Sequence, residues 1–280
     1  MTTPATQPVR ARLRVPPFGV WLVAGFALLA LIGPWIAPWS PEAIDLDAQY
    51  ALPSLQHLLG TGDNGVDIFS VILCGARSSG LVAIASVGIS LLLGASVGAF
   101  AGYRGGRVDQ LVTGIADLVQ AFPSVVLNIA ILALVARPGL LHVILALCAN
   151  GWVLFARIAR AQTLLLREAE YVAAARLLGA SPTHILLHHI APNAASPLIV
   201  QATAALGGAV LAESTLSFLG LGPGGAASWG ALLDQGSAVL LRFPHVALIA
   251  GAAIALTVLG FNLAGDHARD VLDPRTRALR

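Results

Sequence analysis

Charged residues are scarce in this chain. Asp, Glu and Arg together make up 11% of its 280 residues, whereas an average soluble domain carries about 25% charged residues. A soluble enzyme of this length would need more polar surface, and a disordered chain would be highly charged and poor in aliphatic residues. Since the hydrophobic share is 57%, the composition predicts a protein that crosses a membrane several times.

Several functional motifs are absent as well. The two cysteines, Cys74 and Cys148, form no CxxC pair, so neither a zinc framework nor a disulfide framework is indicated. The chain contains no GxxxxGK(S/T) sequence and therefore cannot be the ATPase of a transport system. No HExxH sequence and no paired aspartates lie in the apolar stretches, which argues against a membrane-embedded enzyme. A net charge of +2 is too small to indicate nucleic-acid binding.

Six apolar stretches are long enough to cross a bilayer. About 18 or more residues with few charges are needed, because about 20 helical residues span the hydrocarbon core. The charge-free stretches are residues 15–41, 78–103, 118–136, 138–156, 193–212 and 243–265. We expect the third helix to begin before Asp117, near Asp109. The sequence therefore predicts an all-α membrane protein with six transmembrane helices.

The arginines indicate which side of the membrane each loop faces. If the N-terminus is cytoplasmic, thirteen of the sixteen arginines fall inside and only Arg77, Arg137 and Arg242 fall outside. This asymmetry follows the positive-inside rule, and six spans return the C-terminus to the cytoplasm. The expected divisions are a cytoplasmic tail (1–17), a first transmembrane helix (18–38), an acidic extracytoplasmic loop (39–76), a transmembrane domain (77–266) and a cytoplasmic tail (267–280).

One cytoplasmic connection, residues 160–192, is longer than the others. Ala and Leu recur at helical spacing up to Gly179, which is well placed to end a helix. Ser181 followed by Pro182 predicts the N-cap and first position of a second helix, which ends before Pro192. Short apolar helices that face water need a partner surface, so the loop predicts docking to a cytoplasmic protein. We expect the two helices to cover residues 164–178 and 183–190.

The same loop carries a resemblance to a known family. Its residues YVAAARLLGAS, followed by HHIAPN, resemble the EAA loop of permease subunits of binding-protein-dependent ABC importers. The family pattern is Glu-Ala-Ala, three residues, Gly, nine residues and then Ile-x-Leu-Pro. Ala173 stands in place of the family's glutamate, which faces the ATPase. His189 and Ala191 likewise stand in place of the family's Ile and Leu. The positions that correspond to the pattern are Ala173, Ala174, Ala175, Gly179, His189, Ile190, Ala191 and Pro192.

The resemblance extends over most of the chain, from about residue 18 to residue 276. The segment HLLGTGDNGVDIFSVILCGAR (57–77) is similar to a segment of dipeptide, oligopeptide and nickel permeases of the second-subunit type. Several ordered motifs at the right spacing make the resemblance specific. Further similar segments are residues 98–124, 213–222, 228–230 and 261–275.

The resemblance implies the machinery in which such a permease works. Two permease subunits form a heterodimeric pathway, two ATP-binding subunits hold ATP and Mg²⁺, and an extracytoplasmic substrate-binding protein delivers the cargo. It implies a multi-pass protein of the bacterial inner membrane that is not an enzyme and that carries no cofactor or metal of its own. The residues expected to form the ATPase-coupling loop are Tyr171, Ala173, Ala174, Ala175, Gly179, Ala180, Ser181, His189 and Pro192.

The sequence leaves the cargo open. Short peptides are the most populated class in the family, and nickel or a metal chelate is the alternative. The alternative function from another class of protein is a secondary transporter or channel that works alone. Such a protein would carry flux without partners and would have no use for an EAA loop.

Three polar residues within the apolar stretches, Asp117, Asn128 and Glu213, are candidates for the transport pathway or for structural pairing. Asp117 lies close to the inner boundary of its span. We therefore expect it to pair with Arg107 or Arg157.

Three histidines, His184, His188 and His189, cluster in the loop. The spacing of four between the first two suits a metal site. Because no carboxylate or cysteine accompanies them, we expect contacts to the ATPase or to lipid phosphates, and a metal site is the alternative.

Overall fold

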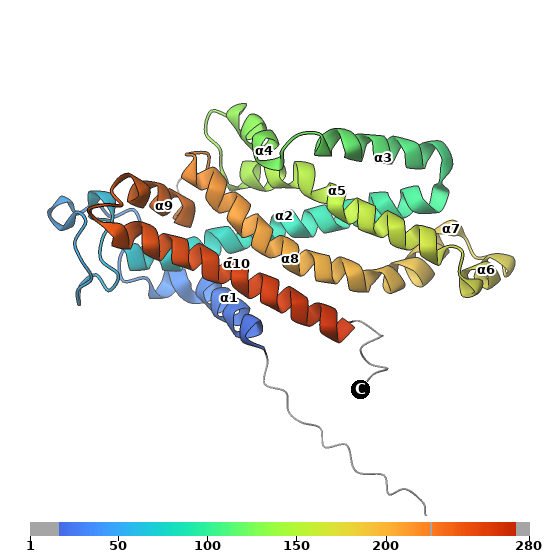
Figure 1. Cartoon of the computed structure of the whole chain (residues 1–280), viewed down its shortest axis with the longest axis horizontal. Coiled ribbons are helices and arrows are strands. Elements are labelled where there is room, and N and C mark those ends of the chain that lie inside the picture. Colours follow the sequence, from blue (N-terminus) through green and yellow to red (C-terminus); the bar gives the residue numbers. More distant parts are fainter. Residues whose placement is uncertain (1–16, 225, 273–280) are drawn as a thin grey trace, which may run out of the picture.

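A computed structural model describes residues 17–224 and 226–272, and these ranges are almost entirely helical (Figure 1). The only β-type pairing in them is an isolated bridge between Thr61 and Asp67. Short 3-10 turns occupy Leu46–Ala48 and Asp63–Gly65, and Ile185–Ile190 forms a π-helical turn. The α-helices are α1 (Phe18–Ile36), α2 (Ile68–Arg104), α3 (Gly106–Gln120), α4 (Ser124–Ala133), α5 (Leu140–Leu166), α6 (Glu170–Leu177), α7 (Pro182–His184), α8 (Ala191–Phe218), α9 (Trp229–Ala238) and α10 (Pro244–Leu272).

Five helical segments among the described residues are long and apolar enough to span a membrane. The helices α3 and α4 pass the same test only as a pair, which is bent by 83° at a short break. Counting that pair as one span brings the number to the six that the sequence predicts. The five continuous segments are Phe18–Ile36, Ile68–Arg104, Leu140–Leu166, Pro182–Phe218 and Pro244–Leu272.

The break between α3 and α4 corrects the prediction of one continuous third helix, which we expected to begin near Asp109 and to include the charge-free stretch 118–136. α3 ends at Gln120 and α4 begins at Ser124. Pro123 explains the interruption, because proline has no N–H to donate and disfavours the helical conformation in the residue before it, Phe122. Irregular backbone at membrane depth is tolerated where protein covers it or where it lines a water-filled cavity.

α2 begins earlier and α10 ends later than the sequence divisions suggest. Ile68 lies inside the stretch 39–76 that we expected to be an outer loop. Asp67 caps the helix, since its Oδ2 accepts hydrogen bonds from the N–H and the hydroxyl of Ser70 at 2.8 and 2.7 Å. α10 continues to Leu272, six residues past the expected end of the transmembrane domain. Of the two expected tails, residues 1–16 and 273–280 lie outside the described residues.

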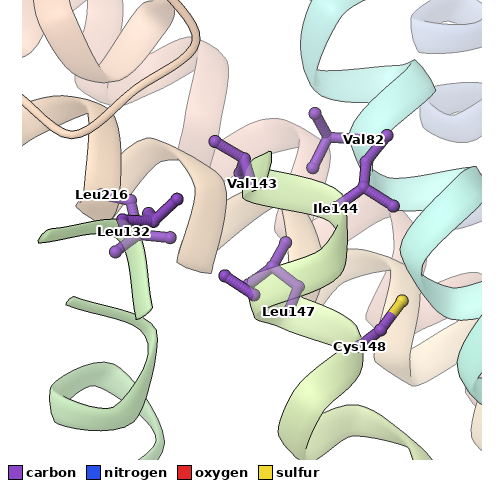
Figure 2. Packing of buried hydrophobic residues seen from close by; sticks show 8 residues of the cluster. Val82, Leu132, Val143, Ile144, Leu147, Cys148 and Leu216 are labelled. Atoms are coloured by element: carbon purple, nitrogen blue, oxygen red, sulfur yellow. The ribbon is translucent and has the colours of Figure 1, made fainter. Parts of the chain in front are cut away.

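Glycine lets α2 approach α5 closely along much of its length. A Cβ on Gly94 would lie 2.2 Å from the carbonyl oxygen of Trp152, and one on Gly98 would lie 2.1 Å from that of Ala156. Small residues at such spacing are the usual means of helix packing in membranes. A second contact region joins α2, α4, α5 and α8 (Figure 2) through the buried residues Val82, Leu132, Val143, Ile144, Leu147, Cys148 and Leu216.

The two ends of the helix bundle differ in structure. α6 and α7 lie at one end, beside the turn that joins α2 to α3 (Figure 1). α9 and the connection between α1 and α2 lie at the opposite end. There the indole of Trp229 is 2% exposed and donates a 3.0 Å hydrogen bond to the carbonyl oxygen of Ile72. The opposite ends therefore offer two separate surfaces to partners.

Candidate functional site

The connection between α5 and α8 forms a compact helical projection, residues 167–190. Gly179 follows α6 with a φ of +83°, a conformation that glycine adopts at little cost. Ser181 caps α7, because its Oγ accepts a 3.3 Å hydrogen bond from the backbone N–H of His184, and Pro182 takes the first helical position. The glycine turn and the Ser-Pro helix start predicted from the sequence are confirmed.

Two predicted boundaries of the loop are wrong. The helix expected over 164–178 is interrupted after Leu166, and α6 begins only at Glu170. The second helix does not end before Pro192, because the π-helical turn runs directly into α8. Pro192 is the second residue of α8, just after the π-helical turn, and its missing N–H removes one hydrogen bond at that junction without ending the helix.

Buried apolar residues anchor the projection to the helices behind it. Val172 of α6 and Ile185 and Ile190 of the π-helical turn are 0%, 0% and 1% exposed, and they pack with partly buried residues at the ends of α2 and α5. Arg167 adds a polar tie, since its Nη1 donates a 2.8 Å hydrogen bond to the carbonyl oxygen of Gly102. These contacts hold the projection against the ends of α2 and α5.

Several large apolar side chains of the projection are exposed. Leu177 and Leu178 are 90% and 89% exposed, Leu187 is 61% exposed and Tyr171 is 44% exposed. The residues that the sequence predicted for the ATPase-coupling loop do not include these three leucines. Two adjacent leucines just before Gly179, in a loop expected to face water, could have indicated an exposed apolar contact. Of the expected residues, those exposed are Tyr171, Ala173, Ala174, Gly179, Ser181 and Pro192, and those partly buried are Ala175, Ala180 and His189.

The histidines of the projection form a ring cluster. The rings of His184 and His188 stack at a centroid distance of 4.3 Å, and His189 contacts His184 edge-on at 5.6 Å. The ring of Tyr171 lies 6.3 Å from that of His189. Among the described residues no group of three or more His, Cys, Asp or Glu side chains could hold a metal ion. The three imidazole rings therefore pack on one another, with the ring of Tyr171 close to them.

Two ion pairs join α3 to α5. Arg157 donates a 2.7 Å hydrogen bond to Asp117, one of the two pairings expected from the sequence. Arg160 binds the carboxylate of Asp109 through two nitrogens, with Nη2 at 2.6 Å from Oδ2. Sequence reasoning missed this second pair, which is better shielded: the side chain of Asp109 is 17% exposed and that of Asp117 is 60% exposed.

Glu213 lies in a closed cluster of hydroxyl groups. It is 0% exposed and accepts hydrogen bonds from Ser79, Ser217 and Ser228 at 2.6, 2.7 and 3.2 Å. These donors come from α2, α8 and the residue before α9. The sequence left open whether Glu213 belongs to the transport pathway or to a structural pairing, and these hydrogen bonds fit the structural role.

A cavity of about 610 Å³ lies at the break between α3 and α4 and is also bordered by α2, α5 and α8. None of its lining residues carries an ionisable side chain. Asn128 is 3% exposed, and its Oδ1 accepts a 2.8 Å hydrogen bond from Nδ2 of Asn150. Of the three polar candidates from the sequence, only Asn128 lines this cavity. The polar side chains in the lining are Ser86, Ser90, Gln120, Ser124, Asn128 and Asn150.

Comparison with known proteins shows the family. Residues 94–278 match the family described as binding-protein-dependent transport system inner membrane component. The chain belongs to this permease family. Residues 16–53 also match the N-terminal TM domain of oligopeptide transport permease C. The protein is therefore a multi-pass permease subunit of an ABC importer in the inner membrane, and ATP hydrolysis takes place in separate subunits.

Similar permeases have names that refer to peptides. The probable D,D-dipeptide transport system permease protein DdpC of Escherichia coli (strain K12) is 40% identical, over 89% of this chain and 83% of its own length. The oligopeptide transport system permease protein OppC of Bacillus subtilis (strain 168) is 37% identical, over 92% of this chain and 85% of its own length. The glutathione transport system permease protein GsiD of Pectobacterium atrosepticum is 37% identical, over 92% of this chain and 88% of its own length.

Solved structures share the fold of this permease at low identity. A chain of the MetNI methionine ABC transporter in inward-facing conformations superposes with a TM-score of 0.61 at 19% identity, over 72% of this chain and 96% of that chain. A chain of an amino acid ABC transporter superposes with a TM-score of 0.55 at 17% identity, over 72% and 94% of the two chains.

Proposed function

We propose that this permease subunit forms half of a translocation pathway for short peptides and couples their import to ATP hydrolysis in partner subunits. One observation carries the coupling role: the projection leaves Leu177, Leu178 and Leu187 exposed and buries Val172 and Ile185 against residues at the ends of α2 and α5. When the two ATP-binding subunits close, they displace the projection. The displacement reaches α5 and α8, because the projection is continuous with both.

We propose the following contacts to the ATP-binding subunit. Tyr171 and the exposed leucines fill an apolar groove on that subunit. Ala173 and Ala174, which lack long side chains, let the groove approach the backbone of α6. The tight Gly179 turn and the Ser181 cap keep α6 and α7 in a constant relative position. ATP and Mg²⁺ are bound by the partner subunits, and this chain holds neither.

The projection lies on the cytoplasmic side in this proposal. The N- and C-termini are also cytoplasmic, and the bent α3–α4 pair is the third of six spans. The charge distribution supports this orientation, because arginines gather at the end of the bundle that carries the projection. These arginines are Arg104, Arg107, Arg157, Arg160, Arg167 and Arg176.

Two further partners complete the transporter. A different permease subunit supplies the other half of the pathway and makes a heterodimer. A substrate-binding protein docks on the extracytoplasmic end, which the α1–α2 connection and α9 form together. That connection has a defined shape, since Gln49 donates a 2.8 Å hydrogen bond to Asp63 and the backbone of Asp45 bonds to that of Asn64 at 2.9 Å.

The chemistry of the cavity supports peptide over nickel as the cargo. Nickel binds imidazole, thiolate or carboxylate ligands, and the cavity lining contains none of these groups. Hydroxyls and carboxamides suit the neutral polar groups of a peptide. The similar permeases named for dipeptide, oligopeptide and glutathione transport support the same cargo class.

The experiment that tests this proposal is purification followed by reconstitution. The chain is produced with the products of its neighbouring genes, purified in detergent and placed in vesicles with the binding protein. We expect co-recovery of an ATPase and a second permease, and ATP-dependent uptake of labelled di- and tripeptides. Uptake of a nickel chelate without uptake of peptides would show that the cargo is the metal chelate and not a peptide. Flux through the single chain without partners would contradict the coupling role.

A further inference from the structure

Two amide side chains that line the cavity at the break between α3 and α4 have hydrogen-bonding atoms without a protein partner in the described part of the chain. The hydrogen bond from Asn150 to Asn128 leaves the amide nitrogen of Asn128 and the amide oxygen of Asn150 without a partner among the described residues. Exchanging O and N in both amides gives the same result, one free donor group and one free acceptor. Asn128 as a whole is 3% exposed, but neither free amide atom is among the fully buried, unpartnered side-chain atoms, so both can reach a molecule in the cavity.

The pair lies inside the bundle, on a spanning helix and beside a helix break. Asn150 is ten residues from the start of α5 at Leu140 and sixteen from its end at Leu166, so it lies well inside a helix that is long and apolar enough to span a membrane. The helix break at Pro123 borders the same cavity. Interrupted helices near the midplane commonly form substrate sites in transporters, since the irregular backbone faces a cavity there.

The chemistry of the pair is that of a peptide group. One free N–H donor group and one free carbonyl acceptor match the C=O and N–H that every peptide bond offers. The cavity volume of about 610 Å³ lies within the range of about 300–1,000 Å³ that is typical of small-molecule sites. Gln120, at the end of α3, adds a third carboxamide, which is exposed and unpaired among the described residues.

We propose that Asn128 and Asn150 form a subsite for the main-chain amide of a peptide in transit, with Gln120 as a further contact. This inference rests on the proposed import of peptides and names the groups that recognise them. Because the contacts are to the main chain, the subsite accepts peptides of differing side chains. A bare metal ion finds no charged or imidazole ligand in it.

The test uses the complete transporter with its binding protein in vesicles and compares two probes. One is the tripeptide Ala-Ala-Ala, and the other is its analogue in which an ester oxygen replaces the central N–H. The double variant Asn128→Leu/Asn150→Leu removes both amides, so neither is left as an unpaired partner. The matched control is Asn262→Leu on α10, since Asn262 lies outside the cavity and lines a separate groove.

The measured quantity is the ratio of uptake of the peptide to uptake of the ester, relative to the same ratio for the unaltered transporter. Discrimination by the binding protein cancels in this comparison. We expect the ratio of peptide uptake to ester uptake to be about five- to tenfold lower in the double variant, which corresponds to the loss of about one hydrogen bond. The Asn262→Leu control keeps the preference of the unaltered transporter.

Two outcomes overturn the subsite: an unchanged preference in the double variant, or loss of uptake of both probes with the preference intact. If the double variant fails to retain the ATPase, the single variant Gln120→Leu replaces it in the test, because Gln120 is exposed. It must show a smaller loss of preference in the same direction, and an unchanged preference there overturns the proposal. If the unaltered transporter takes up no short peptide at all, the proposed function fails instead.

Discussion

The hydroxyl of Ser79 donates a 2.6 Å hydrogen bond to Oε2 of Glu213, a residue 134 positions later in the chain. Ser217 and Ser228 donate to the other carboxyl oxygen at 2.7 and 3.2 Å. Because Glu213 is 0% exposed, these hydroxyls replace water around the carboxyl group. The cluster ties α2, α8 and the start of α9 together in the half of the bundle away from the coupling projection.

We predict that Glu213→Ala destabilises the permease more than Glu213→Gln. Alanine leaves three buried hydroxyls without their acceptor, at a cost of about 2–3 kcal/mol, whereas glutamine retains one acceptor oxygen. The measurement is the thermal unfolding midpoint of the detergent-purified transporter. Asp234→Ala is the matched control, since Asp234 is an exposed acid on α9. Equal midpoints for Glu213→Ala and Asp234→Ala would show that the cluster adds no stability.

The contact between α2 and α5 predicts opposite effects for two glycines of one helix. Gly98→Ala places a methyl 2.1 Å from the carbonyl oxygen of Ala156, so the helices must separate, and we expect a loss of about 1–3 kcal/mol. A methyl added at Gly88 would have no atom within 4 Å, and Gly88→Ala gains up to about 1 kcal/mol in helix propensity. Yield and unfolding midpoint report both effects. A stable Gly98→Ala protein would contradict the close approach.

The two ion pairs between α3 and α5 should differ in importance. Asp109→Ala leaves Arg160 unpaired in a shielded position, and we expect a loss of about 1–2 kcal/mol. Asp117→Ala costs less than about 1 kcal/mol, because that pair is half exposed. Unfolding midpoints of the two variants compare them directly. The reversed pair Asp109→Arg/Arg160→Asp should recover part of the loss, and failure to do so would indicate that packing, not charge, is responsible.

The coupling projection can be tested through two glycines with the same backbone conformation. Gly179 and Gly220 have φ values of +83° and +76°, and neither has an atom within 4 Å of an added methyl. Alanine at either site should therefore cost about 1 kcal/mol through backbone strain alone. Only Gly179→Ala should also reduce the amount of ATPase that co-purifies, because it alters the angle between α6 and α7. Equal ATPase recovery from both variants would argue against the proposed contact.

Local features were predictable from the sequence. The apolar stretches located the five continuous membrane-spanning segments, and Gly179 and Ser181-Pro182 marked the turn and helix start of the projection. These predictions succeed because hydropathy and capping depend on neighbours within a few residues. The break at Pro123 was accessible to the same reasoning, but the lack of charge over 118–136 outweighed it. The early start of α2 was missed because the stretch that contains it is polar.

Partners across helices were mostly not predictable. The sequence offered two arginines for Asp117 and gave no indication of the pair between Asp109 and Arg160. It singled out Glu213 and Asn128 but could not separate a structural hydroxyl cluster from a cavity-lining amide. Each assignment depends on which faces of distant helices meet, and the apolar faces of these helices resemble one another too closely to specify that.

The sequence by itself determined that this protein is a helical membrane permease with a helical loop between two of its spans, because scarcity of charge, span length and the ordered family motifs are properties of the chain. The tertiary structure decided what the few intramembrane polar groups do. Burying a polar group in an apolar medium is costly unless it finds a partner. Glu213 finds its partners in three serines of neighbouring segments, whereas the side chains of Asn128 and Asn150 line the cavity and, among the described residues, bond only to each other.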